Sequence, residues 1–287
     1  MHRRMTAVVL AAGLLAGGCG HSGSSERTAL ARYIAQADAV ELALRSPLAA
    51  VTRAGSVLAR EQAAGAGGQL TSSSAANARA LAQAGARIET LRARLAVITT
   101  PAPASHLRAL LLELIDGQLR LTGEVQRMVL YMPRFATTLT PLLPALRRLE
   151  PALARRSAAG ASAVAAAYKE KAAALRRFAA TLRPLQLALA GLRPPAVSAA
   201  GYRAQLASIE GMSANADRLA SALEGRRSGE TQRILLAFDR AAAAPHSEAV
   251  QKAQIAAVRA YDLQVQALER ESGAAEAERD RLASTVH

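Results

Sequence analysis

The chain has 287 residues, enough for one large domain or two modest ones. It is 51% hydrophobic but only 3% aromatic, and it contains no Trp, so Ala and Leu supply most of its apolar surface. Because Ala has the highest helix propensity and no long alternating run of Val, Ile and Thr is present, this composition favours an all-α fold and argues against a sheet.

The first eighteen residues have the order of an export signal. Arg3 and Arg4 form a basic region, Ala7–Ala16 is an apolar run, and the small residues Gly17 and Gly18 follow. A membrane-spanning helix needs about 20 apolar residues, so this run is too short to be one. We therefore expect residues 1–18 to be a signal peptide that is removed on export.

The only cysteine of the chain, Cys19, comes directly after this signal. The stretch Leu15-Ala16-Gly17-Gly18-Cys19 resembles the lipobox of bacterial lipoproteins, although lipoboxes usually carry Leu where this chain has Ala16. The resemblance implies that Cys19 is lipidated with a diacylglyceryl group, becomes the mature N-terminus, and anchors the protein to the outer face of a bacterial membrane. Gly20 is not the Asp associated with inner-membrane retention in that family, so sorting to an outer membrane would be allowed.

The residues around Cys19 support this interpretation. A buried structural cysteine would need a core around it, whereas the Gly- and Ser-rich segment 20–25 is expected to be a flexible tether. With one Cys, the chain has no internal disulfide. Two or more acyl chains, at ~0.8 kcal/mol per buried CH₂, would hold the protein stably to a bilayer.

Apolar residues at spacings of three and four predict amphipathic helices along the first half of the mature chain. Ser24 or Ser25 begins the first helix, which Pro47 is expected to kink or split, and residues 65–75 are expected to form a loop. The second helix ends before Pro101, and Ser105 is expected to cap the third after a short connection that implies antiparallel packing. The second helix has a coiled-coil-like seam of Leu81, Ala84, Ile88, Leu91, Leu95 and Ile98.

In the second half, four prolines between 133 and 151 predict short helical pieces or a bent helix. The next helix has the clearest seam of the chain, and it crosses Pro184. The two remaining helical regions contain Tyr202–Leu223 and Ile234–Leu282, the latter interrupted near Pro245. The seam of the central helix consists of Val164, Tyr168, Leu175, Phe178, Leu182, Leu185, Leu189 and Leu192.

Together these elements predict an all-α protein of long antiparallel helices in one or two bundles. Residues 26–131 would form a first half, 132–155 a proline-interrupted connection, and 156–287 a second half with a charged C-terminal helix. The stretches "LAVITTPAPASHLRALLLELI" and "LAGLRPPAVSAAGYRAQLASI" share a helix end, a proline pair and a new helix. An internal duplication and simple convergence both explain this similarity.

No residue pattern indicates a catalytic, cofactor or metal site, so we expect neither a cofactor nor enzymatic activity. Serine-nucleophile motifs are absent, and His106 and His246 are far apart in sequence. Lys171 is the one polar residue on the central seam; we expect its stem to extend from the helix edge, with a buried functional lysine as the alternative.

Two groups of carboxylates recur at helical spacing. Glu210, Asp217 and Glu224 are seven residues apart, and Glu113 and Asp116 precede Arg120. We expect both groups on solvated helix faces, with arginine partners within one turn of the same helix.

The positive charge lies in the middle of the chain. Pro101–Glu230 carries 18 basic and 9 acidic residues, whereas Thr231–His287 carries 7 and 8. Such a region would attract anionic headgroups or a cell-wall polymer, and a solvated helix face is the alternative interpretation. An exported protein is not expected to bind nucleic acid.

The sequence therefore predicts a non-enzymatic scaffold or interaction module of the cell envelope, with an unknown protein partner. The alternative is a ligand-binding or sensory bundle whose small apolar pocket would be lined by Tyr168, Phe178 and Tyr202. An exposed apolar or basic stripe would favour interaction, and an internal cavity with convergent polar groups would favour ligand binding.

Overall fold

The computed structural model describes residues 21–63, 70–155 and 160–286, and every regular element within them is helical. This confirms the predicted all-α helical bundle. Short 3₁₀ turns connect several of the helices: η1 (Ala102–Ala104), η2 (Ala196–Ser198) and η3 (Ala244–His246). The α-helices are α1 (His21–Ala63), α2 (Leu70–Val97), α3 (Ser105–Leu139), α4 (Leu142–Ala154), α5 (Ala161–Ala190), α6 (Ala199–Glu224), α7 (Ser228–Ala243) and α8 (Glu248–Val286).

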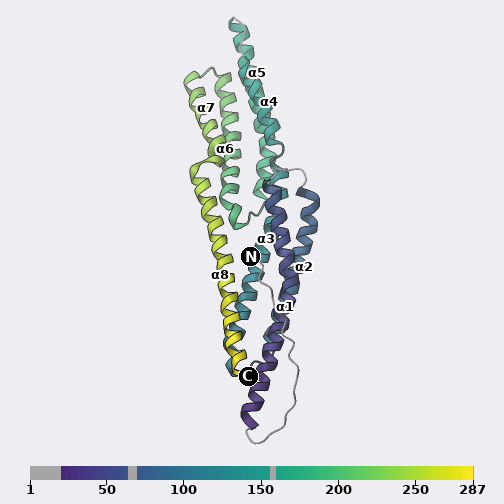
Figure 1. Cartoon of the computed structure of the whole chain (residues 1–287). Coiled ribbons are helices and arrows are strands. Elements are labelled where there is room, and N and C mark those ends of the chain that lie inside the picture. The colour runs from purple at the N-terminus through teal and green to yellow at the C-terminus, as the bar shows by residue number, and fades with distance from the viewer. Residues whose placement is uncertain (1–20, 64–69, 156–159, 287) are drawn as a thin grey trace.

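The molecule is elongated, because two helical bundles follow one another along its long axis (Figure 1). We call the first the proximal bundle, since α1 begins there; it contains α1, α2, most of α3 and the C-terminal half of α8. The distal bundle contains α4, α5, α6 and α7, with the end of α3 packed against it. Helices α3 and α8 connect the two bundles.

Each bundle buries most of the apolar seams that the periodicity predicts, but Tyr168 of the α5 seam is exposed, and Val164 and Leu192 are only partly buried. In the distal bundle, fully buried alanines bring α5 and α6 together, because Ala allows close approach of two helix backbones: Ala172, Ala179, Ala216 and Ala220. The larger distal core residues include Leu175, Phe178, Leu182, Leu189, Ile209 and Leu219. The proximal core includes Leu30, Tyr33, Ile88, Leu95, Leu107, Ile115 and Leu282.

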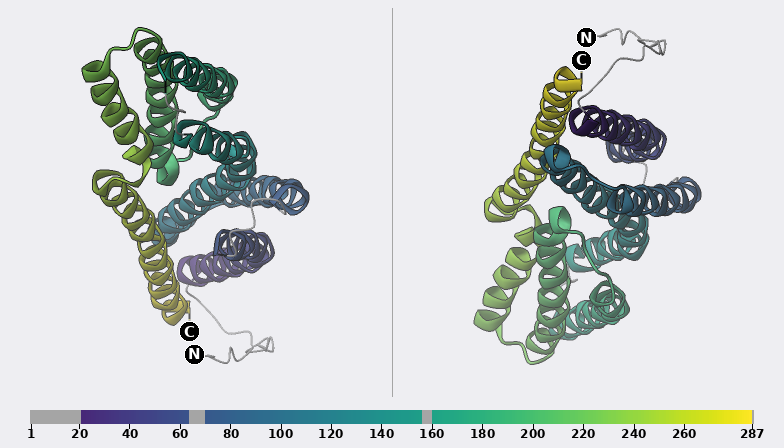
Figure 2. Two further views of the ribbon diagram at one scale, coloured as in Figure 1. Left: turned by 90° about the horizontal axis from the view of Figure 1, so that it is seen from above. Right: turned by 90° about the horizontal axis from the view of Figure 1, so that it is seen from below.

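Helix α8 packs with both halves of the sequence: its N-terminal part contacts α6, η2 and η3, and its C-terminal part packs against α1 and α3. Ala275 and Leu282 are buried in one cluster with Leu30 of α1 and Leu107 of α3. Figure 2 shows the yellow end of α8 beside the purple helix α1, so the first and last helices are neighbours. Periodicity identifies the apolar stripe of a helix, but it does not identify the bundle that covers the stripe.

The prolines interrupt the helices less than expected. Pro47 is buried inside α1, which continues to Ala63 as one helix, so the predicted split is wrong. Pro133 and Pro184 also lie inside their helices. A helical proline removes one backbone hydrogen bond, and burial of the flanking apolar residues offsets that loss.

Two helix starts also differ from the expectation. Helix α1 begins at His21, within the segment expected to be a tether, and α2 begins at Leu70, within the segment expected to be a loop. Ser105 does not cap α3: its Oγ donates a hydrogen bond to the carbonyl oxygen of Ala102, and Ala104 is the N-cap residue. The 3₁₀ turn η1 therefore replaces a side-chain cap.

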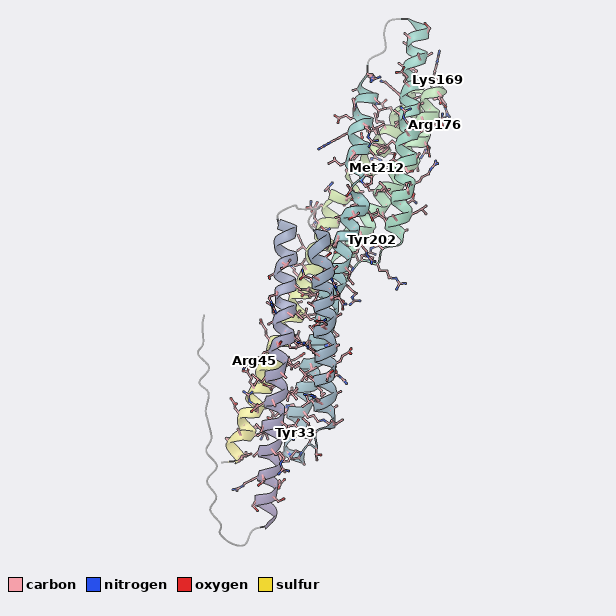
Figure 3. All side chains as sticks on the ribbon, turned by 90° about the vertical axis from the view of Figure 1, so that its right-hand side faces the viewer. Tyr33, Arg45, Lys169, Arg176, Tyr202 and Met212 are labelled. Carbon is pink, nitrogen blue, oxygen red and sulfur yellow. The ribbon has the colours of Figure 1, made fainter. Side chains whose placement is uncertain are left out.

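Tyrosines join the two bundles. Tyr131 of α3 stacks on Phe135, with ring centroids 5.3 Å apart, and its ring meets the edge of Tyr202 of α6 at 6.5 Å. The hydroxyl of Tyr202, which lies at the junction in Figure 3, donates a hydrogen bond of 2.9 Å to the carbonyl oxygen of Leu189 in α5. Burial raises the pKa of Tyr131. The junction thus combines an aromatic contact between α3 and α6 with a hydrogen bond from α6 to α5.

Candidate interaction surface

Residues 1–20 lie outside the described part of the chain, so the structure does not describe Cys19 or the predicted signal peptide. The described chain begins with α1 at His21, two residues after Cys19. This helix start lies at the end of the proximal bundle that is farthest from the distal bundle (Figure 1).

The described residues contain no group of three or more His, Cys, Asp or Glu side chains arranged to hold a metal ion. His106 and His246 are both exposed, the former at the start of α3 and the latter in η3. Lys171 is half-buried on α5.

The three acidic residues spaced by seven along α6 face α5. Arg176 donates two hydrogen bonds of 2.6 Å to Glu224, Arg183 donates one of 2.8 Å to Asp217, and Gln186 donates one of 3.2 Å to Glu210. The prediction of arginine partners on the same helix is therefore wrong. The contacts form an antiparallel ladder along one side of the α5–α6 pair.

Asp116 likewise pairs with another helix. Arg92 of α2 donates two hydrogen bonds to it, the Nη2 bond being 3.0 Å long. This hydrogen bonding holds the pKa of Asp116 below its usual range, with a smaller contribution from the charge of Arg120. Both side chains are partly exposed, so the pair orients α2 against α3 and adds little stability.

The aromatic residues expected to line one pocket are far apart. Phe178 is buried in the distal core, whereas Tyr168 lies ten residues earlier on α5, roughly 15 Å away at 1.5 Å per residue. Tyr202 contacts Leu189, eleven residues beyond Phe178, or roughly 16 Å along the same helix. The three side chains do not share a cavity.

The distal bundle has an open apolar groove between α4 and α7. Its floor is formed by the buried residues Leu175 and Leu219, and its volume is about 370 Å³. On its sides, Leu143 is 54% exposed and Leu235 is 42% exposed. Exposed leucines beside an apolar floor are typical of an interaction surface.

One sequence feature marks the α7 side of this groove. Ile234, Leu235 and Leu236 are consecutive, and three consecutive side chains on a helix spread over about 200° of its circumference, so they rarely all face one core. Ile234 is buried, while Leu235 and Leu236 are exposed. In α7 this run therefore places two leucines outside the core.

The positive charge belongs mainly to the distal bundle. Residues 142–243 carry 16 basic and 7 acidic residues, whereas residues 21–141 and 244–287 together carry 18 and 15. Within the described residues, distal basic side chains without a carboxylate partner occur on every helix of this bundle, for example Arg147, Arg177, Arg218 and Arg233. The charge therefore surrounds the bundle and does not form one flat basic face.

Comparison with protein-family models, with curated proteins and with solved structures finds no match to this chain. Among the residues that the structure describes, no helix combines the length and the apolar character needed to cross a bilayer.

Proposed function

We propose that this chain is a lipid-anchored scaffold of a bacterial cell envelope, without enzymatic activity of its own. In this proposal Cys19 carries the anchor, the proximal bundle is a rigid spacer, and the distal bundle is the interaction module. The partner would be another component of the envelope.

The observation that carries the proposal is the position of the helix next to the predicted anchor. Helix α1 begins two residues after Cys19 at one end of an elongated molecule, and the distal bundle lies at the other end (Figure 1). Helix α1 has 43 residues and α5 has 30, which correspond to about 65 Å and 45 Å. In a protein anchored at the first end and standing upright, the distal bundle would begin roughly 65 Å from the bilayer, and its far tip would be at most about 110 Å away.

The exposed surface of the distal bundle supports interaction over ligand binding as the main role. The groove between α4 and α7 is open and apolar, with exposed Leu143 and Leu235, and the cores beneath it are closed by fully buried residues such as Leu175. Leucines exposed to water are unfavourable unless another surface covers them, at about 25 cal/mol for each Å² of apolar area.

Acyl labelling in a bacterial host tests the anchor. Cys19→Ser should lose both the label and membrane association, while Ser22→Ala, three residues further on, should keep both. Equal labelling of the Cys19→Ser chain and the unmodified chain would contradict the proposal.

Site-specific photocrosslinking in intact cells tests the interaction module. A photoreactive residue at the exposed distal position Leu235 should give a defined crosslinked species, and one at the exposed proximal position Leu42 should not. The distal product should decrease when Leu143 is changed to Glu. If both positions give the same products, or neither gives any, the distal bundle is not the interaction module.

A further inference from the structure

A second groove lies on the other side of α4, between α4 and α5, with a volume of about 250 Å³. Its floor is apolar, because Leu149 of α4 and Phe178 of α5 meet there, 5% and 4% exposed. Space remains above this floor since the facing residues Ala145, Ala152 and Ala174 have short side chains. A short hydrocarbon segment placed in the groove would lie on this floor, beside the alanine side chains.

Two arginines line this groove, one from each helix. Arg148 of α4 and Arg177 of α5 are both exposed, and within the described residues neither has a carboxylate within 4 Å. The adjacent Arg176 is different, since it donates two hydrogen bonds to Glu224. Arg148 and Arg177 thus have their guanidinium donors available to a ligand.

No carboxylate lines the α4–α5 groove, and this separates it from two other grooves of the described chain. The groove between α4 and α7 has Glu150 and Asp239 beside its one arginine, and a groove between α3 and α8 has Glu124 and Glu271 beside its arginines. A ligand with a negative charge would meet repulsion in those two grooves, but only positive charge in the α4–α5 groove. A groove beside Arg32 of α1 also lacks a carboxylate, but it contains one arginine where the α4–α5 groove has two.

We propose that the α4–α5 groove is a binding site for a small amphiphile with one anionic head, a carboxylate or a phosphate, on a hydrocarbon chain. The head accepts hydrogen bonds from the guanidinium groups of Arg148 and Arg177, whose planar fork matches both kinds of oxyanion. The first carbons of the chain lie on Leu149 and Phe178. This site goes beyond the scaffold function proposed above and does not depend on it.

Calorimetric titration of the full-length Cys19→Ser chain tests the site with soluble probes of one chain length. Octanoate and octyl phosphate should bind, while octanol and inorganic phosphate should not, since each of the latter has only half of the required chemistry. The stronger of the two binding probes identifies the head group. Binding of octanol as tight as that of octanoate, or equal binding of inorganic phosphate and octyl phosphate, would overturn the proposal.

Adjacent arginines provide a matched control. Arg148→Gln and Arg177→Gln should each weaken octanoate binding at least about fivefold, the effect of losing one charge-assisted hydrogen bond of roughly 1 kcal/mol. Arg147→Gln should leave binding unchanged, because Arg147 lines the groove on the other side of α4. An equal loss for Arg147→Gln would show a general charge effect and reject the site.

A third variant tests the groove itself. Ala152→Leu adds three carbon atoms above Leu149 and Phe178 and should abolish octanoate binding, with a thermal unfolding midpoint close to that of the parent chain. If this variant binds octanoate with unchanged affinity, the probe binds elsewhere and the proposal fails. If its midpoint falls, Ala174→Leu, which fills the groove from the α5 side, gives the same test.

Discussion

Leu268 of α8 occupies the space that a side chain on residue 117 of α3 would need, and residue 117 is a glycine. A Cβ built on Gly117 would overlap the Cδ2 atom of Leu268 and would lie 3.4 Å from its Cγ. Leu268 is 8% exposed, so the contact is part of the packing of α8 against α3. Gly117 therefore determines how closely the returning helix approaches the proximal bundle.

Substitution of this glycine should destabilise the protein. Gly117→Ala forces Leu268 out of its position, and overpacking of this kind costs about 1 to 3 kcal/mol. Gly123 on the same helix has no atom within 4 Å of its added Cβ, so Gly123→Ala should stabilise the protein by about 0.5 to 1 kcal/mol through helix propensity. Urea denaturation midpoints of the two variants and the parent chain measure the difference.

A double-mutant cycle checks the cause. Leu268→Ala makes room for a Cβ at residue 117, so the Gly117→Ala change should cost less in the Leu268→Ala background than in the parent chain. Additive effects of the two changes would show that this contact does not limit the approach of α8.

The central seam of the distal bundle should be sensitive to truncation. Leu182 is fully buried between α5 and its neighbours, so Leu182→Ala should lower the free energy of unfolding by about 2 to 5 kcal/mol. Leu187, on the same helix, is 75% exposed, and Leu187→Ala should change it by less than about 0.5 kcal/mol. Similar effects of the two truncations in chemical denaturation would mean that α5 packs by another face.

Periodicity predicted most of the buried face of α5, because the side chains that share one side of a helix follow from local geometry. Phe178, Leu182 and Leu185 share one side of α5, and all three are less than 9% exposed. The same local pattern could not show which helix covers that face. Helix α8 is the clearest example, since its apolar stripe pairs with α1 and α3, about 150 or more residues earlier in the chain.

The partners of charged residues were predicted less well than the burial of apolar residues, because these partners also depend on which helices are neighbours. The spacing of Glu210, Asp217 and Glu224 correctly places them on one side of α6, but their partners are on α5. A carboxylate at the edge of a helix interface reaches the neighbouring helix as easily as the next turn of its own. The pair of Arg176 and Glu224 therefore depends on tertiary packing, and helical spacing alone cannot predict it.

Ionisation of Glu41 in α1 should destabilise the folded state. Burial raises its pKa above the ordinary range, and the nearby carboxylates of Asp38 and Glu276 add to this effect. Arg279 opposes it from 3.1 Å, but this arginine also lies near Asp38 and Asp280. A glutamate whose pKa is higher in the folded state destabilises that state once the group is ionised.

Glu41→Gln should therefore be more stable than the parent chain at pH 7. The difference should shrink as pH falls through the folded-state pKa and vanish below the ordinary glutamate value of about 4.3, where both forms are neutral. Thermal unfolding of the two chains between pH 3.5 and pH 8 measures this. A variant that is less stable at pH 7 would show that the pair with Arg279 outweighs burial.

Glu278 provides the opposite case on α8. Its hydrogen bonds with Arg281 lower its pKa, so it stabilises the folded state above the ordinary glutamate pKa, and this contribution is lost as pH falls through the folded value. Glu278→Gln should accordingly lose stability at pH 7 and match the parent chain in acid. If Glu41→Gln and Glu278→Gln change the stability at pH 7 in the same direction, the substitution itself, and not the loss of a titrating group, causes the effect.

The distribution of charge on the distal bundle predicts a preference between two kinds of anionic partner. A flat bilayer touches one face of the bundle, whereas a flexible polymer can follow basic residues on all of its helices, such as Arg147, Arg177, Arg218 and Arg233. If Cys19 is the anchor, the distal bundle also lies far beyond the Debye length of about 8 Å from its own membrane.

The full-length Cys19→Ser chain should therefore bind polyglutamate more tightly than anionic vesicles at equal charge concentration. Binding to polyglutamate should weaken as salt rises from about 50 to 300 mM, since it depends on neutralised charges. Glutamine at Arg147, Arg177, Arg218 and Arg233 together should weaken it more than glutamine at the ion-paired Arg92, Arg127, Arg279 and Arg281 of the proximal bundle. Tighter binding to the vesicles, or an equal loss in the two fourfold variants, would contradict a polymer-binding distal bundle.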